Sequence, residues 1–211
     1  MAAPKLAKAR STGRKLEGIE LVSRAKLPTV FGDFIIYGFL QQEGNKEHTA
    51  LVHGTVKGRS DCTVRIHSEC HTGDIWGSLR CDCRQQLEAS LQYVQEQECG
   101  VVIYLRQEGR GIGLLNKLRA YDLQDQGLDT VEANQQLGLP TDARTYEAAA
   151  AIIRLLGIRS VALMTNNPDK IRGLTEAKIQ ISRRIPLVIR SNAYNRDYLL
   201  TKRERLGHML D

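Results

Sequence analysis

The chain has 211 residues, a net charge of +6, 42% hydrophobic residues and 26% charged residues. This composition is ordinary for a globular protein that buries a core of its own. Its apolar runs fall far short of the roughly 20 residues that a membrane-spanning helix needs, and no segment has the pattern of a secretory signal. We therefore expect a cytoplasmic protein with no membrane partner, in a compartment where clustered thiols bind metals more often than they form disulfides.

Positive charge is concentrated at the N-terminus. The first 15 residues hold five basic residues and no acidic one, which leaves 25 of the 30 basic residues against all 24 acidic residues in the rest of the chain. A nucleic-acid-binding domain should carry its positive excess in its folded part, so we expect no nucleic-acid partner. We predict a basic, disordered tail at 1–24 and a folded domain at 25–211; the composition of the tail also fits an organelle transit peptide.

The region from about 28 to 68 predicts an antiparallel β-region. The segments at 31–39 and 49–56, FGDFIIYGF and TALVHGTV, are rich in β-branched and aromatic residues and flank the turn-forming QQEGNKEH. The segment CTVRIHS at 62–68 alternates and is predicted to be a third strand.

The second half alternates between helical and strand patterns. The spacing of apolar residues predicts helices at 84–98, 114–126 and about 142–156, the last two ended by Gly127 and Gly157, with a fourth beginning at Pro168 after the capping residue Asn167. Short apolar runs predict buried strands at 101–105, 161–165 and 185–189. The predicted fold is α+β, with an N-terminal antiparallel β-rich half followed by a βαβ-like half in a single compact domain.

Three of the five cysteines fall in the stretch HSECHTGDIWGSLRCDC. Cys70, Cys81 and Cys83 have the spacing C-x10-C-x-C, and such clustering favours a metal site over small core residues. Zinc suits thiolate ligands, and a site with three ligands leaves one position open for an activated water. His67 and His71 compete as a fourth ligand that would close the site, and we favour the open, catalytic alternative.

Two loops after predicted strands carry residues suited to a phosphorylated ligand. In RQEGRGIG, glycines let backbone N–H groups approach a phosphate, Arg110 can bind it, and Glu108 can accept from a base or ribose, although a flexible turn explains the loop equally well. In TNNPDK, Thr165 and Lys170 can reach a polyanion, although a plain capped helix explains this stretch better. Asp142 in TDARTYE is, by default, a helix cap.

Together these residues resemble one family, GTP cyclohydrolase II, which catalyses the first committed step of riboflavin biosynthesis. The matching stretches are RIHSECHTGDIWGSLRCDCRQQLE, RQEGRGIGLLNKLRAYDLQDQGLDTVEAN, PTDARTY and LMTNNPDKI. They occur in the family's order with its approximate separations, and the resemblance covers roughly residues 25 to 210. Agreement across several separated motifs is far more specific than any one of them.

The resemblance implies a hydrolase that binds one zinc ion per subunit through Cys70, Cys81 and Cys83, and magnesium with the triphosphate of its substrate, GTP. An activated water adds to C8 of the guanine and opens the imidazole ring, and formate and pyrophosphate leave. The product is 2,5-diamino-6-ribosylamino-4(3H)-pyrimidinone 5′-phosphate. The resemblance also implies a homodimer. The residues that it implies for the GTP site are Arg65, Ile66, His67, Ser68, Glu69, Gln86, Glu108, Gly109, Arg110, Thr130, Thr165 and Lys170.

Three catalytic residues are also implied by the resemblance. Asp142 is the proton acceptor, Arg144 is the nucleophile at the α-phosphorus, and Tyr121 lies near the reacting base. Because a guanidinium stays protonated, a clamp on the transition state is the more conservative role for Arg144. His71 departs from the family, where an apolar residue is expected. Two other functions stay open: a non-catalytic, zinc-stabilised nucleotide-binding module, and a related enzyme that stops at the formylated intermediate.

Overall fold

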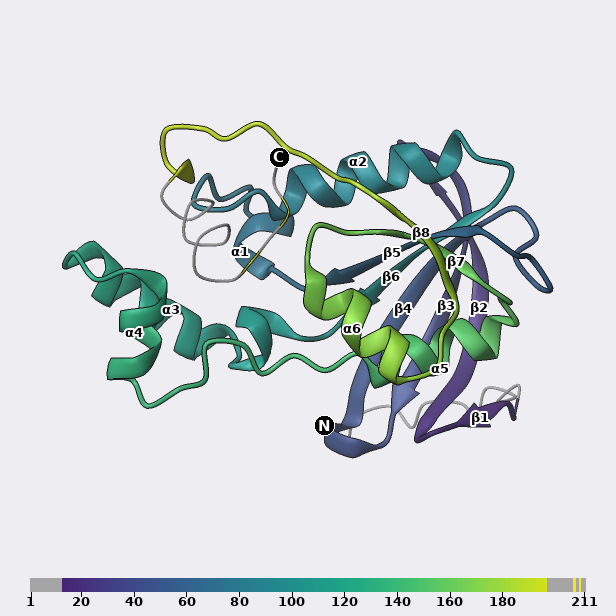
Figure 1. Ribbon diagram of the computed structural model, residues 1–211, viewed down its shortest axis with the longest axis horizontal. Helices are drawn as coiled ribbons and strands as arrows, with labels where there is room; N and C mark the ends of the chain where they lie inside the picture. The colour runs from purple at the N-terminus through teal and green to yellow at the C-terminus, as the bar shows by residue number, and fades with distance from the viewer. Residues whose placement is uncertain (1–12, 197–206, 208, 210–211) are drawn as a thin grey trace, which may run out of the picture.

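The computed structural model describes residues 13–196, 207 and 209. Within them, eight strands form one sheet in the order β1-β2-β3-β4-β6-β5-β7-β8 (Figure 1). The strands are β1 (Lys15–Leu16), β2 (Ile19–Thr29), β3 (Gly32–Gln41), β4 (Lys46–His53), β5 (Cys62–Ser68), β6 (Gly100–Leu105), β7 (Val161–Met164) and β8 (Ile181–Ile185). The helical elements are η1 (Glu43–Asn45), α1 (His71–Asp74), α2 (Cys83–Gln95), η2 (Glu108–Gly111), α3 (Leu114–Asp125), α4 (Thr130–Gln136), α5 (Glu147–Leu156) and α6 (Pro168–Glu176).

The sheet changes character in its middle. The strands from β1 to β4 are antiparallel, β6 pairs antiparallel with β4, and β6, β5, β7 and β8 run parallel to one another. The predicted α+β class is therefore confirmed. The prediction that 62–68 is a third antiparallel strand is wrong, because β5 lies between two parallel neighbours. All of its residues but the last are buried, so it has no exposed face.

Helices cover both faces of the sheet (Figure 1). Leu91 and Val94 of α2 pack on Phe34 and Val102 on one face. On the other face α5 joins the largest apolar cluster, and eight of its ten residues are buried. Figure 1 also shows α3 and α4 projecting beyond the sheet on the side where β5 and β6 end. This projection places α3 and α4 near the carboxyl ends of the parallel strands (Figure 1), where open α/β sheets bind ligands.

The N-terminal boundary differs from the prediction. β1 and most of β2 lie within 1–24, so the prediction of a disordered tail is wrong for residues 15–24. β2 pairs with β3 along nearly its whole length, and Ile19 and Leu21 are buried in the main core. Because the segment is rich in basic residues, its short apolar pattern did not indicate these two strands. Residues 1–12 of the predicted tail lie outside the described residues.

Three elements in the second half also differ from the prediction. The last strand is β8, four residues before the predicted one, and its charged SRR segment is an edge strand held by pairing with β7. The helix predicted from about 142 begins at Glu147, because the Asp142 side chain accepts a bond from the Arg144 backbone N–H and favours a local turn. α4 was not predicted, although Asp129 and Glu132 form a capping box.

The predicted helix ends and caps hold in other places. Gly157 adopts a left-handed conformation with φ of 75° after α5, and Asn167 accepts a bond from the Asp169 backbone N–H at the start of α6. Pro168 is the first residue of that helix, where its missing N–H costs nothing. Among the described residues, no helix has both the length and the apolar character needed to cross a bilayer.

His48 in β4 is a buried histidine that the fold holds in its neutral form. Its Nδ1 accepts a bond from the Arg106 backbone N–H at 3.1 Å, so Nε2 carries the proton and donates to Gln41 Oε1 at 2.9 Å. Burial, assisted by the positive charges of Lys46 and Arg106, lowers the pKa of His48 from 6.5 to about 4.

We expect this histidine to make the protein less stable as the pH falls from 6.5 to 4. Above this window the ring is neutral in both states, whereas within it only the unfolded chain binds the proton. The free energy of unfolding should then fall by up to about 1.4 kcal/mol per pH unit. Urea unfolding at pH 7 and pH 5 measures the loss. His48→Gln should show a smaller loss, and an equal loss in both proteins would contradict the assignment.

Candidate active site

A cavity of about 480 Å³ lies at the carboxyl ends of the parallel strands, between them and the α3–α4 projection. It brings together all of the sequence-predicted site residues except Ile66 and Asp142. Those that line it are Arg65, His67, Ser68, Glu69, Cys70, Cys81, Cys83, Gln86, Glu108, Gly109, Arg110, Tyr121, Thr130, Arg144, Thr165 and Lys170. Three of the motifs meet here because they follow β5, β6 and β7, which end at this edge of the sheet, whereas the segment with Arg144 follows α4.

The three clustered cysteines form one wall of the cavity. Their sulfur atoms all lie within 4.8 Å of one another, and the Sγ atoms of Cys70 and Cys81 are 3.8 Å apart. A tetrahedral zinc ion with Zn–S bonds of about 2.3 Å requires sulfur atoms about 3.8 Å apart, so the group fits zinc. Hydrogen bonds with Cys81 and Cys83, and the positive charge of Lys117, lower the pKa of the Cys70 thiol.

Gly73 makes room for this group of sulfur atoms. A Cβ at this position would lie 2.8 Å from the Sγ of Cys81 and 3.1 Å from that of Cys70. The short helix α1 therefore turns around the thiols in a way that only a glycine permits.

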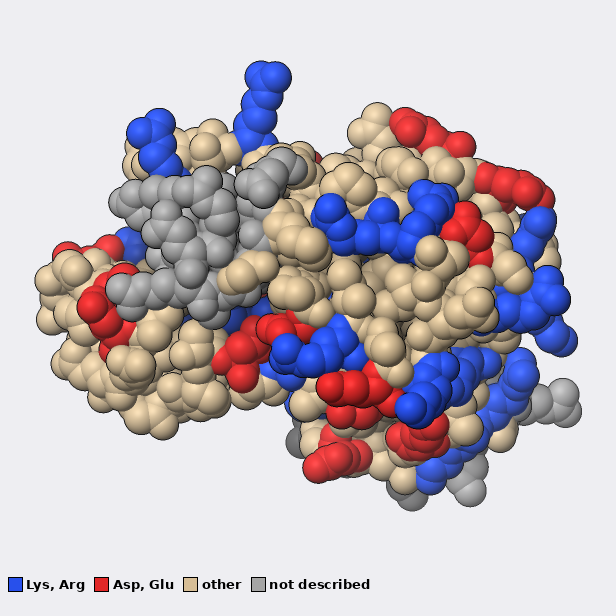
Figure 2. Space-filling view, in the orientation of Figure 1, with Lys and Arg blue, Asp and Glu red and all other residues tan. Residues whose placement is uncertain are grey.

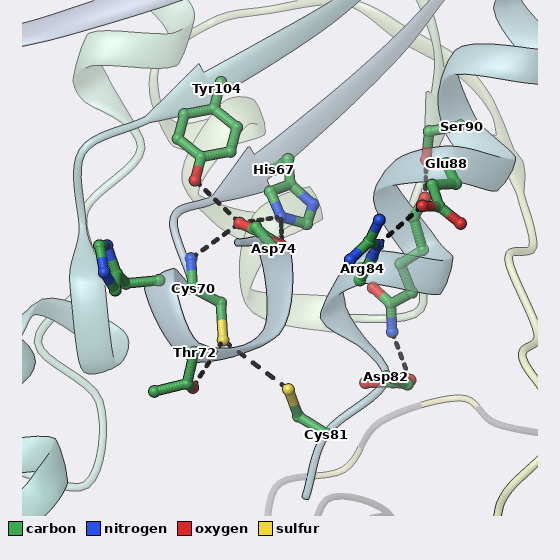
Figure 3. A network of polar contacts seen from close by, with 12 residues as sticks. His67, Cys70, Thr72, Asp74, Cys81, Asp82, Arg84, Glu88, Ser90 and Tyr104 are labelled. Carbon is green, nitrogen blue, oxygen red and sulfur yellow. Dashed lines mark hydrogen bonds and ion pairs between the residues drawn. The ribbon is translucent and has the colours of Figure 1, made fainter. Parts of the chain in front are cut away.

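Asp74 holds the turn that carries Cys70 (Figure 3). Its carboxylate accepts bonds from the Cys70 backbone N–H at 3.0 Å and the Tyr104 hydroxyl at 2.8 Å, and it lies 3.1 Å from His67 Nε2. Since the carboxylate only accepts, His67 donates from Nε2. Burial lowers the pKa of His67, although Asp74 opposes this effect. Nε2 is thus committed to Asp74 rather than to a metal.

His71 does not join the thiols either. Among the described residues, the group of metal-ligand atoms consists of the three cysteine sulfurs. The His71 ring instead packs edge-on against Trp76 with 6.0 Å between ring centroids, and its backbone N–H donates to Glu108 Oε2 at 2.5 Å. The arrangement therefore supports a site with three protein ligands.

Two buried cations lie in the cavity wall formed by β5 and α6. Arg65 donates to the Met164 carbonyl at 3.1 Å and to Gln86 Oε1 at 2.6 Å, and burial lowers its pKa to about 10, so it is charged at neutral pH. Lys170 Nζ donates to the Ile66 carbonyl at 2.7 Å. The Ile66 side chain itself is buried in the main core, which explains why it does not line the cavity.

The loop 108–111 is a rigid support rather than a flexible turn. Glu108 accepts bonds from the Gly109 N–H at 2.6 Å and from Lys117 Nζ at 3.0 Å, in addition to the bond from His71. Gly109 and Gly111 have φ of 60° and 90°, and a Cβ on Gly111 would lie 3.0 Å from the Ala143 backbone. The loop thus needs these glycines for its own conformation. Its contact with Ala143 brings the neighbouring residue Arg144 to the cavity.

Asp142 and Arg144 form an ion pair outside regular helix. Arg144 Nε donates to both carboxylate oxygens of Asp142, at 2.9 and 3.1 Å, and Nη2 also contacts this carboxylate. Burial raises the pKa of Asp142, but the hydrogen bonds and charge of Arg144 outweigh it and hold the pKa below its usual range. The predicted cap is wrong, because α5 starts at Glu147 without a side-chain cap. Asp142 lines a smaller neighbouring hollow, and Arg144 reaches both.

The structure adds cavity residues that the sequence analysis missed. Arg80 and Lys117 line the cavity next to Tyr121, with the Arg80 guanidinium carbon 4.9 Å and Lys117 Nζ 5.7 Å from the centroid of the Tyr121 ring. The Tyr121 hydroxyl lies 3.5 Å from Thr72 Oγ1, beside the thiols, and burial raises its pKa to about 12. Lys117 and Tyr121 are four residues apart on α3, a spacing that places both on one face and could have indicated Lys117.

Comparisons with known proteins show which family the chain belongs to. The family model described as GTP cyclohydrolase II matches residues 20–186. The chain belongs to the GTP cyclohydrolase II family. It is 57% identical to the GTP cyclohydrolase-2 of Picrophilus torridus over 191 residues, which are 90% of this chain and 99% of that relative. It is 51% identical to that of Escherichia coli O9:H4, with 92% and 98% covered, and 49% identical to that of Buchnera aphidicola subsp. Acyrthosiphon pisum, with 91% and 99% covered.

Membership of this family confirms the predicted resemblance and the predicted class of enzyme. The matched region of this chain, residues 20–186, includes the thiol group, the loop 108–111 and α6. The roles predicted for individual residues stay predictions.

Proposed function

We propose that the protein is a zinc-dependent hydrolase that opens the imidazole ring of GTP and releases formate and pyrophosphate. The product would be 2,5-diamino-6-ribosylamino-4(3H)-pyrimidinone 5′-phosphate, which commits GTP to riboflavin biosynthesis. One observation carries this proposal: a three-thiol group that fits zinc and the buried cations Arg65 and Lys170 line the same cavity. The family's name supports GTP as the substrate.

The proposed roles of the cavity residues follow from the chemistry of their side chains. Cys70, Cys81 and Cys83 would hold zinc, which supplies a Lewis acid and an activated water when bound. Arg65 and Lys170 would bind the triphosphate together with magnesium. Both side chains line the cavity and are buried, so water solvates their positive charges poorly and an anion in the cavity would interact with them strongly. Tyr121 lies beside the thiols, where it would contact the reacting base.

Arg144 would act at the α-phosphate as a clamp. Its guanidinium is already oriented by Asp142 and lines the cavity, whereas the Asp142 carboxylate is committed to Arg144. A protonated guanidinium stabilises a developing phosphoryl charge and is a poor nucleophile. The nucleophile and proton-acceptor roles implied by the resemblance would require this ion pair to open first.

Product analysis tests the proposal. Purified protein with GTP, magnesium and zinc should release formate and pyrophosphate in equal amounts, and a chelator that removes zinc should stop the release of formate. Protein that contains zinc and yet releases neither product would overturn the proposal in favour of a nucleotide-binding module. Release of pyrophosphate without formate would identify an enzyme that stops at the formylated intermediate.

We also propose that the protein forms a homodimer. Several apolar side chains near the cavity are exposed, among them Trp76, Leu79, Leu115 and Leu118. Figure 2 shows mostly uncharged residues on the face of the α3–α4 projection that it displays. Exposed apolar patches of this kind mark protein interfaces. Sedimentation velocity at micromolar concentration should give the mass of two chains, and a monomer would contradict the proposal.

A further inference from the structure

We propose that Lys117 is a positioning residue whose ammonium group is the shared counter-ion of the Cys70 sulfur and the Glu108 carboxylate. Through this contact it sets the electron density on the sulfur and the affinity of the three thiols for their metal. The inference rests on the proposed function in one respect, that a metal binds to the three cysteines.

The contacts of Lys117 are specific. Its Nζ lies 3.2 Å from Cys70 Sγ and 3.0 Å from Glu108 Oε1. Both side chains of the ion pair are about nine-tenths buried, with 11% and 10% exposed. An ion pair with so little solvent around it keeps one geometry, whereas an exposed pair moves among several.

The backbone of the loop 108–111 is built against the stem of this lysine. A Cβ on Gly109 would lie 3.2 Å from Lys117 Cβ, so the loop approaches α3 closely. Glu108 then connects Lys117 to the turn after Cys70 through its bond from the His71 N–H at 2.5 Å. Lys117 and Glu108 therefore tie α3, the loop and the metal-binding turn into one unit.

Charge balance gives this arrangement a function. Three thiolates around a divalent zinc ion carry a net charge of −1, and a buried charge is costly unless a partner compensates it. The ammonium of Lys117 supplies that compensation at the sulfur of Cys70. A hydrogen bond to a thiolate also withdraws electron density from the sulfur, which makes the metal a stronger Lewis acid. Outer-shell partners of this kind typically change metal affinity or activity by about 10- to 100-fold when they are removed.

The same geometry revises the role of Glu108. Its carboxylate already accepts bonds from His71, Gly109 and Lys117. A group committed to three donors is better suited to positioning the turn than to reading a base or a ribose. Glu108 thus contributes to the site through Lys117 and the loop backbone.

The test uses the full chain with cobalt(II) or zinc(II) bound, and three variants: Lys117→Met, Lys117→Arg and Lys117→Gln. Lys26→Met is the matched control, because Lys26 is an exposed lysine on β2. The sulfur-to-cobalt charge-transfer band reports the electron density of the thiolates directly. Competition with a chromogenic chelator gives the affinity for zinc.

We expect the charge-transfer band to move to longer wavelength and the zinc affinity to fall by about 10- to 100-fold in Lys117→Met. Lys117→Arg, which keeps the charge, should stay close to wild type, and so should Lys26→Met. Lys117→Gln keeps a polar side chain and provides the same comparison if the methionine variant does not fold. A band and an affinity that are unchanged in the folded neutral variant, or equally disturbed in Lys117→Arg, would overturn the inference.

This result separates the inference from the proposed function. Wild-type protein that binds neither cobalt nor zinc at the cysteines would overturn the proposed function, and the inference with it. Wild-type protein that binds metal and releases formate, with Lys117→Met indistinguishable from it, would overturn the inference alone.

Discussion

Cys81→Ser is expected to lose bound zinc and to release formate from GTP at least about a thousandfold more slowly, while the protein stays folded. A serine hydroxyl is a harder donor than a thiolate and stays protonated at neutral pH, so it does not replace the missing ligand. Without the metal, the water that attacks the ring would have to be activated from a pKa near 15.7 instead of one near 7. Metal content by mass spectrometry and formate release measure the two effects.

The expectation that the fold survives comes from where the thiols lie. The main core is formed by the sheet and α5, and it contains none of the three predicted ligands. Structural zinc sites, by contrast, supply folding free energy outright. The melting temperature of Cys81→Ser should therefore stay within a few degrees of that of metal-free wild type. Cys99→Ser is the matched control, since Cys99 is a free cysteine outside the thiol group and should keep its metal and its turnover.

Two outcomes would contradict this expectation in different ways. If Cys81→Ser unfolds while Cys99→Ser does not, the metal is structural, as in a zinc-stabilised binding module. If Cys81→Ser keeps full turnover, the thiol group is not the reactive centre.

Much of the site was predictable because its parts follow the ends of buried strands. The runs that became β6 and β7 are apolar throughout, so their positions were clear from the sequence, and the loops after them had to meet at one edge. The thiol group was predictable for a similar reason, since the spacing of Cys70, Cys81 and Cys83 needs only one local turn to bring the sulfurs together. Gly73 leaves room for them.

The rest depended on contacts between segments far apart in the chain. β8 has a charged sequence and is a strand only because β7 pairs with it. Lys117 is an ordinary helical lysine in the sequence, and it gains a role only when α3 meets the turn at Cys70. The positions of Asp142 and Arg144 follow from a side-chain bond that competes with helix formation, which the pattern of apolar residues does not report.

Arg65→Met is expected to weaken the binding of GTP by about 100-fold or more and, at the same time, to stabilise the free protein slightly. Arg65 is 5% exposed, and among the described residues its guanidinium donates to two neutral acceptors, the Met164 carbonyl and the Gln86 amide oxygen. Removing a buried, hydrogen-bonded charge from an interface typically costs about 2–5 kcal/mol of binding free energy. The methionine fills a similar volume without the charge.

The effect of Arg65→Met on stability is the difference between two contributions, the cost of burying the charge and the loss of its hydrogen bonds. Burial lowers the pKa of Arg65 from 12.5 to about 10, which corresponds to about 3 kcal/mol of destabilisation of the charged form. Arg65→Met removes that cost but loses two hydrogen bonds, each with a net contribution of about 1 kcal/mol. The free energy of unfolding should therefore rise by about 1 kcal/mol, whereas Arg24→Met on the exposed face of β2 should change neither quantity.

Calorimetry with GTP and magnesium on zinc-free protein measures the affinity without turnover, and urea unfolding measures the stability. Weaker binding of GTP together with a higher free energy of unfolding would mean that the fold accepts the cost of a buried cation because that cation binds the substrate. If Arg65→Met loses stability and keeps its affinity, Arg65 is a structural donor to β7 and α2, and the triphosphate must bind elsewhere in the cavity. A loss of both would mean that the residue supports the fold and the ligand through the same hydrogen bonds, and that the cost of burying its charge is smaller than its pKa implies.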